Sequence, residues 1–396
     1  MRAVAPRVMR ALVGWILVVG LTAIAVHPER CGRPTDAAVR TAAEQAVAWF
    51  AANIDDEGDF LYRWDRGRET EEGGYNDTRH AGVLWSLWQA ERLGVDGAGA
   101  VAEAGFARVE RLLVDTVVGP AVGVGSRLGS GTVGLLVAAL DERRLATGRT
   151  DLDGLLIDFG HTLTAVVNED GSVSANIHVD DGPDDSRSPF FTGEVMWALA
   201  RLHLTFPDEG FDAPALRIRR YLVHDRDDVE RPWPPVSDHW GAYAFETMSR
   251  WPDPPAMTEA DRTWRRRQLG LFSLQVRYES QRVGGLTTLT RGETALAAGV
   301  GTLGEGLGNH LLHALATGDL ESDLGTLVTR ADCAAHLLVS RQITTDDAAH
   351  EAEPERSVGA WFRLGDTQMD DQQHALSALL LVEEVRRELR AREAAP

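Results

Sequence analysis

NDTRHAGVLWSL, residues 76–87, and DDQQHALSALLL, residues 370–381, align without a gap and decide how this chain folds. Each stretch opens with polar and acidic residues, has a His at the same position and continues into an apolar run. GEVMWAL, residues 193–199, matches the apolar part of the first stretch, and NHLLHAL, residues 309–315, fits the same frame. A segment that recurs about every 60 residues indicates an array of similar supersecondary units.

The repeated units are predicted to be helical hairpins. Apolar residues recur at helical spacing in many stretches separated by Gly, Pro and Asp clusters, whereas strand patterns are sparse. We therefore predict an all-α chain. The expected hairpins are 36–53 with 76–94, 97–118 with 129–147, 152–167 with 188–206, 213–223 with 237–251, 258–282 with 304–316, and 320–340 with 370–390.

The likeness between the first and last units predicts a closed ring. An open array needs polar capping units at both ends, but here the two terminal units are the ones that most resemble each other. The second helices, rich in Ala, Leu and Trp, look more apolar than the first ones, which places the second helices in an inner ring. The expected fold is an (α/α)6 toroid of six hairpins in one domain, residues 31–396.

The composition is that of a globular protein, and it excludes several functional classes. Of the 396 residues, 44% are hydrophobic and 25% are charged, so a large buried core is expected. The formal charge of −20 repels phosphate, so nucleic acid is not an expected partner. All 40 basic residues are Arg, which excludes lysine chemistry and a nucleotide-binding P-loop.

Residues 1–30 have the layout of a signal peptide or a membrane anchor. Arg2, Arg7 and Arg10 precede an uncharged apolar run, residues 11–26. This run is slightly shorter than the ~20 residues that span a bilayer, and Ala23-Ile24-Ala25 offers a cleavage pattern. A cleaved signal and an uncleaved transmembrane anchor both fit the sequence. We expect an exported, extracytoplasmic protein that is either secreted or held at the membrane by this segment.

Cys31 and Cys333 are the only cysteines. Outside the cytoplasm a disulfide between them is compatible with the sequence, which leaves open whether they are bonded. Two cysteines so far apart argue against a cysteine-rich structural zinc site. No metal and no cofactor is expected.

The starts of the inner helices are where we expect the functional site, because a ring of hairpins places all of these starts around one pit. Asp77 and His80 are three residues apart, as are Asp371 and His374, so each pair lies on one helical face. Polar N-caps and first-turn acids have a structural role in many helices. Capping does not, however, explain a His one turn later in two units.

This pattern resembles the (α/α)6-barrel, or six-hairpin, carbohydrate-active enzymes, which include glycoside hydrolases, polysaccharide lyases and sugar epimerases. The resemblance covers most of residues 36–392 and is most distinctive in GGYNDTRHAG, residues 73–82. It implies a role in carbohydrate metabolism, with a carbohydrate or a cell-envelope glycan as the partner. Because a fold does not establish a function, the expected role of each residue rests on its own chemistry.

A glycoside hydrolase needs two carboxylates that flank the scissile bond. We predict Asp77 as the base and Asp371 or Glu194 as the acid, because neighbouring helix axes lie ~8–10 Å apart. The residues predicted to bind or position the sugar are Asn76, Arg79, His80, Trp64, His239, Trp240, Tyr243, Glu246, Glu305, Asn309, His374 and Trp361. Trp233 is a further candidate for a flat apolar face at the rim of the pit.

Other functions stay open at this point. A polysaccharide lyase or a sugar epimerase would use His239 or Tyr243 to remove a proton beside a carboxylate held by Arg79. A noncatalytic envelope protein would bind glycan or lipid in the same pit, or would assist the assembly of cell-surface polymers. A helical-toroid cyclase is disfavoured because the metal-binding motif DDxxD would need Asp where His374 stands.

Overall fold

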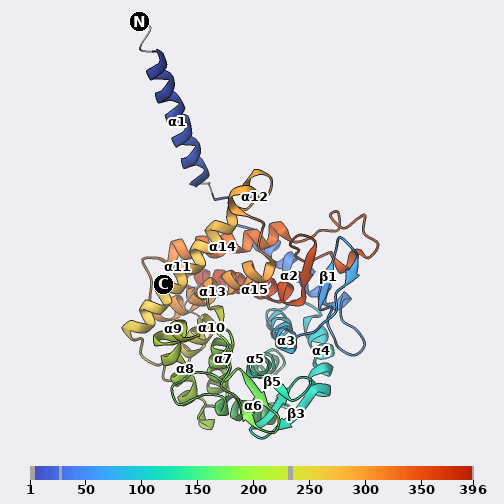
Figure 1. The fold of residues 1–396 in the computed structure, drawn as a ribbon. Coiled ribbons are helices and arrows are strands. Elements are labelled where there is room, and N and C mark those ends of the chain that lie inside the picture. The colour runs from blue at the N-terminus through green and yellow to red at the C-terminus, as the bar shows by residue number, and fades with distance from the viewer. Residues whose placement is uncertain (1–4, 26–28, 231–234, 395–396) are drawn as a thin grey trace.

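The computed structural model describes residues 5–25, 29–230 and 235–394 of the chain. Arg2 and Val26, at the two ends of the predicted export segment, lie outside the described residues, as does Trp233. Helices dominate the described part, and together they form a ring (Figure 1). The prediction of an all-α toroid is confirmed, except for short strands in the connecting loops.

The ring consists of six helical hairpins. The outer helices are α2 (Asp36–Ala52), α4 (Ala98–Leu112), α6 (Asp153–Ala165), α8 (Asp212–His224), α11 (Glu259–Ser280) and α14 (Leu324–Arg341). The inner helices are α3 (Asp77–Arg92), α5 (Ser130–Thr147), α7 (Phe191–Thr205), α10 (His239–Met248), α13 (Ala297–Thr317) and α15 (Met369–Ala394). Each inner helix contacts the next around the ring, and α15 contacts α3, so the ring is closed.

Burial distinguishes the inner helices from the outer ones. All ten residues of α10 are buried, and α5 is buried continuously from Ser130 to Arg143. A helix that is buried all round belongs in the interior. The outer helix α2 instead buries one stripe that includes Val39, Ala43 and Ala46, and leaves its other face in solvent.

The seam between the first and last hairpins is closed by a small sheet as well as by helix packing. Strand β1 (Arg63–Asp65) lies between β2 (Thr70–Glu71) and β8 (Asp366–Gln368), and Trp64 is paired with Thr367. Across the same seam, Arg79 Nε lies 3.3 Å from Asp370 Oδ2. The prediction that the first and last hairpins lie side by side is therefore confirmed.

Two other loops carry strands. A hairpin of β3 (Leu113–Thr116) and β4 (Gly119–Val122) follows α4, so the helix expected to run to Val118 ends at Leu112. This end is consistent with the β-branched residues that follow it, since Val and Thr favour strands. A three-stranded sheet joins β5 (Arg127–Gly129), β6 (Asn176–His178) and β7 (Gly182–Pro183).

The start of α13 was predicted wrongly, because the helix begins at Ala297 rather than at Gly304. Glycines in this part of the helix serve close packing against α15. A Cβ atom on Gly301 would lie 2.4 Å from the carbonyl carbon of His374, and one on Gly304 would lie 2.8 Å from Ala378 Cβ. Gly at these positions lets the two inner helices approach closely.

The amino-terminal helix α1 (Ala5–Ala25) projects from the ring (Figure 1). Within the described part of the chain, no helix combines the length and the apolarity that crossing a membrane requires. Behind α1, the segment from Glu29 onward is joined to α14 by a disulfide between Cys31 and Cys333, whose Cα atoms are 5.0 Å apart. The remaining short helices are α9 (Arg226–Val229), α12 (Leu286–Arg291), η1 (Pro207–Glu209) and η2 (Pro354–Arg356).

Candidate active site

A cavity of about 430 Å³ opens at the amino-terminal ends of the inner helices. All six inner helices, or the residues just before them, contribute to its wall. The lining residues are Asn76, Thr78, Arg79, Leu135, Phe190, Phe191, Glu194, His239, Trp240, Ala298, Gly299, Thr302, Asp370, Gln373 and His374. The pit expected from the ring geometry therefore exists, and it combines charged, amide and aromatic side chains.

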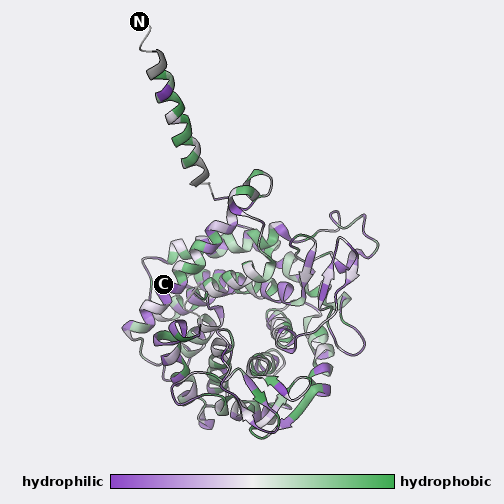
Figure 2. Cartoon of the chain, viewed as in Figure 1, coloured by the Kyte–Doolittle hydropathy of each residue, from purple (hydrophilic) through white to green (hydrophobic). Residues whose placement is uncertain are grey.

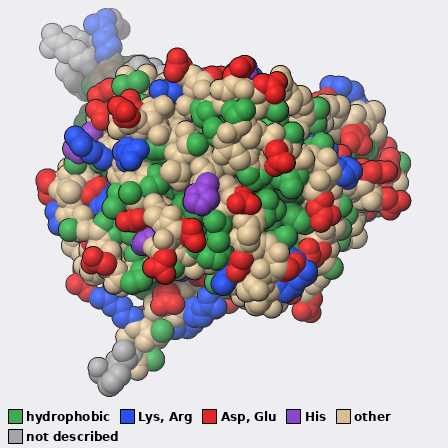
Figure 3. Space-filling view, turned by 90° about the horizontal axis from the view of Figure 1, so that it is seen from below, with side chains coloured by type: hydrophobic (Ala, Val, Ile, Leu, Met, Phe, Trp, Pro, Cys, Tyr) green, Lys and Arg blue, Asp and Glu red, His purple; other side chains and the backbone are tan. Residues whose placement is uncertain are grey.

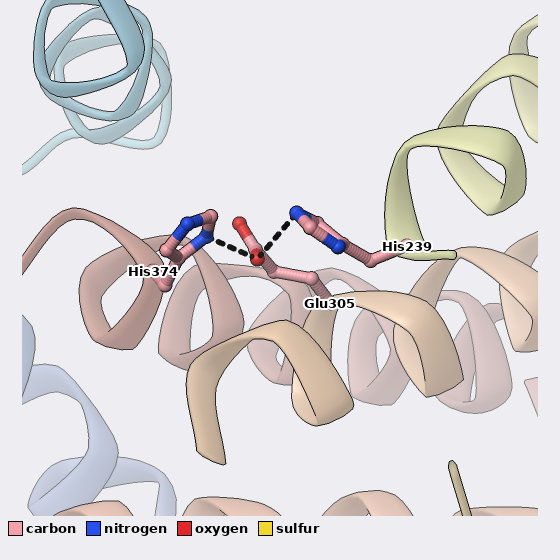
Figure 4. A group of neighbouring side chains, drawn as sticks. All are labelled: His239, Glu305 and His374. Atoms are coloured by element: carbon pink, nitrogen blue, oxygen red, sulfur yellow. Dashed lines mark hydrogen bonds and ion pairs between the residues drawn. The ribbon is translucent and has the colours of Figure 1, made fainter. Parts of the chain in front are cut away.

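Two imidazoles face one buried carboxylate at the floor of this cavity (Figure 4). His374 Nδ1 lies 2.7 Å from Glu305 Oε2, and His239 Nε2 lies 3.8 Å from the same oxygen. The Tyr243 hydroxyl donates to the other oxygen, Glu305 Oε1, at 3.2 Å. Glu305 is fully buried, so it acts on the cavity through the two histidines that line it.

The pKa values of the two histidines are displaced in opposite directions. Burial lowers the pKa of His374, but the attached Glu305 carboxylate, with Asp370 and Asp371 nearby, more than offsets this and raises the pKa above its ordinary value. Burial and the neighbouring His374 hold the pKa of His239 well below its ordinary value. One imidazole is thus suited to give a proton and the other to accept one.

Capping and ion pairing fix the position of His239. It is the first residue of α10, and the preceding Asp238 caps this helix by accepting a hydrogen bond from the backbone N–H of Gly241 at 2.8 Å. Arg226, a fully buried residue, holds the other oxygen of Asp238 in an ion pair and also pairs with Asp227 at 2.7 Å. The position of the first turn of α10 therefore depends on this buried arginine.

Four buried polar atoms of the cavity wall have no hydrogen-bond partner in the described structure. They are Glu194 Oε2, His239 Nε2, Asp370 Oδ1 and Gln373 Nε2. Buried polar groups without partners are rare in native proteins, because losing water without a replacement hydrogen bond costs about 1–3 kcal/mol. Twelve other buried polar atoms without a partner lie elsewhere in the described residues, so these four mark polar groups of the cavity wall and do not by themselves indicate a ligand.

The same histidines and Glu305 also form a possible metal-binding set. Their ligand atoms all lie within 4.8 Å of one another, and two imidazoles with one carboxylate suit divalent transition metals. In the present arrangement the carboxylate instead contacts the His374 ring nitrogen directly.

We expect chelator-treated protein to keep its activity, measured as turnover after dialysis against EDTA. A loss that Zn²⁺ or Mn²⁺ restores would make the three side chains metal ligands instead.

Solved structures of sugar-processing proteins have the same architecture. Cellobiose 2-epimerase from Spirochaeta thermophila is 12% identical, with a TM-score of 0.60 over 90% of this chain and 99% of the epimerase. An unsaturated glucuronyl hydrolase specific for heparin is 12% identical, with a TM-score of 0.60 over 89% and 99%. A GH76 α-mannanase from Bacteroides thetaiotaomicron is 9% identical, with a TM-score of 0.57 over 89% and 97%.

This chain is an (α/α)6 toroid. At these identities the comparison shows the fold alone. No family model and no curated protein matches the sequence. The functional argument for the toroid therefore rests on its own side chains.

The structure brings part of the predicted site together. The predicted residues that line the cavity of the toroid are Asn76, Arg79, Glu194, His239, Trp240 and His374. Asn76 also caps α3, since its side chain accepts a hydrogen bond from the backbone N–H of Arg79 at 3.0 Å. Tyr243, Glu246 and Asn309 line a separate small cavity at the opposite end of the inner ring.

The placement of both predicted catalytic aspartates requires correction. Asp77 lies outside the cavity lining and pairs with Arg108, whose Nη2 is 2.9 Å from Asp77 Oδ1. Asp371 is buried beside the cavity and accepts backbone hydrogen bonds from Ala298 and Gln368, both at 2.9 Å. It thus ties the starts of α13 and α15 together. Neither carboxylate is placed to flank a bond of a ligand in this cavity.

His80, Trp64 and Trp361 also lie elsewhere than expected. His80 Nε2 donates to the carbonyl of Gly105 at 3.0 Å, its Nδ1 accepts from the Tyr75 hydroxyl at 2.8 Å, and burial lowers its pKa to about 4. It is a neutral core histidine between α3 and α4. Trp64 and Trp361 are also buried, and the Trp361 indole donates to the carbonyl of Leu338 at 2.8 Å.

Sequence reasoning missed several residues of the cavity wall. The most prominent are Phe190 and Phe191, just before and at the start of α7, and Gln373, next to His374. Phe190 is 46% exposed, which is unusual for a large apolar side chain beside a polar cavity. The pair of Phe residues at a predicted inner-helix start was the available signal.

We expect Asp371→Asn to lower the free energy of unfolding by about 1–3 kcal/mol, because its amide NH₂ would face one of the two backbone donors that the carboxylate now satisfies. Urea unfolding measures this loss, with Asp77→Asn as the partly exposed comparison. Turnover per folded molecule should fall far less than it does when a histidine of the cavity is replaced. Abolished turnover at unchanged stability would restore Asp371 as a catalytic acid.

Proposed function

We propose that this protein is a sugar epimerase or isomerase that moves a proton beside the carbonyl group of a reducing sugar. The observation that carries the proposal is the pair His239 and His374, which line one cavity, share contact with Glu305 and have oppositely displaced pKa values. A base and an acid on one substrate are what such proton transfer requires.

The chemistry assigns a role to each group. Neutral His239 removes the proton from the carbon next to the carbonyl of the open-chain sugar, while protonated His374 gives a proton to the carbonyl oxygen, and an enediol forms. To give the isomer, His239 returns its proton to the former carbonyl carbon while His374 takes the proton of the other enediol hydroxyl. To give the epimer, a proton from solvent reaches the first carbon on its opposite face while His374 takes back the proton that it gave to the oxygen, and His239 then loses its proton to solvent. Glu305 holds the ring of His374 at 2.7 Å and stabilises its charged form.

The rest of the cavity supports a sugar as the substrate. Trp240 and Phe191 supply flat apolar surfaces, and the four polar atoms without partners suit several hydroxyl groups. Arg79 reaches the same wall, where it is held by Asp370 and by the Tyr62 hydroxyl at 2.8 Å. Two of the structurally similar proteins are a sugar epimerase from a ruminal bacterium and a cellobiose 2-epimerase.

Deuterium incorporation tests this function directly. The purified protein is incubated in D₂O with a panel of reducing mono- and disaccharides, and proton NMR follows the hydrogen beside the carbonyl. We expect loss of that signal together with the appearance of an epimer or a ketose. Absence of exchange with every sugar, while oligosaccharides are cleaved, would contradict the proposal.

A glycoside hydrolase is the second candidate, and Glu194 is the observation that favours it. Burial and the neighbouring Asp238 raise the pKa of Glu194 to about 8, so it is protonated at neutral pH and faces the cavity that Asp370 also lines. A protonated acid opposite a carboxylate is the pair that hydrolysis needs. Release of new reducing ends from envelope glycans, lost in Glu194→Gln but retained in His239→Asn, would favour this candidate. An unsaturated product absorbing in the ultraviolet would indicate a lyase, and binding without any product would indicate a carbohydrate-binding protein.

We also propose that the protein acts outside the cytoplasm. The basic and apolar residues before Glu29 and the disulfide between Cys31 and Cys333 support this location, because disulfides persist in oxidising compartments.

The pH dependence of turnover follows from the two pKa displacements. The active form has His239 neutral and His374 protonated. Turnover should therefore fall as pH rises through the raised pKa of His374, above 6.5, and should fall on the acid side only well below 6.5. The plot of kcat/KM against pH measures both limbs. A rate that increases steadily from pH 6.5 to 8.5 would contradict the assignment of His374 as the acid.

A further inference from the structure

The edge of the ring nearest α1 carries exposed leucines that the proposed reaction does not use. The short helix α12 stands out from this edge, and Leu286 and Leu289 on it are each 84% exposed (Figure 1). They are three residues apart and so lie on one face of α12. Large apolar side chains exposed together mark a surface that contacts something other than water.

The segment around α12 carries no acid of its own. Residues 280–292 contain two Arg and no Asp or Glu, while Glu279 and Glu293 adjoin the segment and Glu279 pairs with Arg282 at 2.9 Å. By contrast, Asp and Glu side chains are scattered over the side of the molecule seen from below (Figure 3). Apolar side chains flanked by Arg are typical of segments that lie at a lipid surface.

The helix α1 leaves the ring close to α12. Glu29, which follows α1 in the chain, pairs with Arg277 near the end of α11 at 3.0 Å and also pairs with Arg330 of α14. Four residue steps separate Ala25 from Glu29, so their Cα atoms are at most about 14 Å apart. Two ion pairs and the disulfide of Cys31 therefore keep the end of α1 beside the edge that bears α12.

The apolar side chains of α1 point to the nature of the partner. Trp15, Ile16 and Leu21 are each about two-thirds exposed, and apolar residues dominate the described length of this helix (Figure 2). A lipid bilayer is the partner that would cover both this helix and α12, since the two are held at one edge.

We propose that α12 is a second membrane contact, in which Leu286 and Leu289 enter the boundary between lipid head groups and acyl chains while the exposed apolar side chains of α1 contact the same bilayer. The two contacts fix the orientation of the toroid. Figure 1 views the ring along its axis, with α1 and α12 at its rim, so the axis of the ring runs parallel to the membrane. The catalytic cavity then opens along the membrane surface rather than toward or away from it. The proposal does not depend on the chemistry performed in the cavity.

Site-specific fluorescence tests this contact in the full chain. Leu289→Cys adds one free thiol beside the native disulfide, and this thiol is labelled with an environment-sensitive fluorophore. The protein is then reconstituted into vesicles of phosphatidylcholine with phosphatidylglycerol. We expect a blue-shifted emission that lipids carrying a nitroxide near the head group quench strongly. Leu145→Cys, at an exposed leucine near the end of α5, is the matched control and should stay unquenched.

The outcomes separate lipid from the other partners. Unquenched emission at Leu289 in vesicles that retain the protein would overturn the proposal. A Leu289→Cys disulfide between two chains in detergent would also overturn it, because a second copy of the chain would then cover α12. A label at Val283→Cys is compared in two proteins, one with the native leucines and one with the double substitution Leu286→Glu, Leu289→Glu. We expect lipid quenching of this label in the first protein and loss of the quenching in the second. Turnover of a soluble sugar should be the same in both.

Discussion

Replacing His374 with Asn is expected to reduce kcat/KM of the sugar reaction by about 10²–10⁴-fold, the usual contribution of a positioned acid or base. His374 lines the cavity, and its contact with Glu305 raises its pKa above the ordinary value. Asn preserves polarity and approximate size but cannot exchange a proton with the substrate. The initial rate and the rate of deuterium incorporation should fall together, because both need the same proton transfer.

The control for this substitution is His161→Asn. His161 is 55% exposed at its side chain and lies on the outer helix α6, away from the cavity. The substitution His161→Asn should leave both the rate of the sugar reaction and the melting temperature unchanged. A His374→Asn protein that melts normally and keeps more than a tenth of its turnover would exclude His374 from the chemistry.

Replacing Arg226 with Met is expected to cost about 3–5 kcal/mol in the free energy of unfolding, the typical effect of removing one partner of a buried ion pair. The guanidinium of Arg226 is fully buried and contacts the carboxylates of Asp227 and Asp238. Met fills a similar volume but leaves the Asp238 charge without its partner inside the protein. Urea unfolding measures the loss.

Replacing Arg226 with Met should also displace His239 in the cavity. Asp238 caps α10 directly before His239, so a displaced Asp238 would move the imidazole relative to Glu305. Arg220→Met, on the exposed face of the adjacent helix α8, is the matched control and should change stability by less than about 0.5 kcal/mol. Equal stability of the Arg226 and Arg220 variants would show that the buried pair is not needed to hold the start of α10.

Local sequence patterns were sufficient to predict most of the ring. Helix periodicity located every outer and inner helix, and the likeness of residues 76–87 to 370–381 indicated that the first and last hairpins are neighbours. Such patterns succeed because similar units pack against their neighbours in similar ways, and a closed ring gives each unit a neighbour on both sides. The start of α13 was misplaced at Gly304, and the role of the preceding Gly301 depends on the close approach of α15 and not on its own neighbours in the chain.

The spacing of residues in the sequence could not predict which side chains line the candidate cavity. His80 and His374 occupy the same position in two aligned stretches, yet His374 faces the cavity and His80 is bonded to Gly105 in the wall between α3 and α4. Asp371 likewise has the spacing of a site residue, but its two oxygens are taken up by backbone N–H groups.

The sequence by itself determined the helices, their order around the ring and the end of the ring at which polar groups gather. Only the tertiary structure decided which of those groups meet, because that depends on how far each helix is rotated about its own axis. A rotation of one residue position turns a side chain by about 100°, from the cavity to a neighbouring helix. Glu305, His239 and His374 come from three different helices, and their meeting depends on how these helices pack.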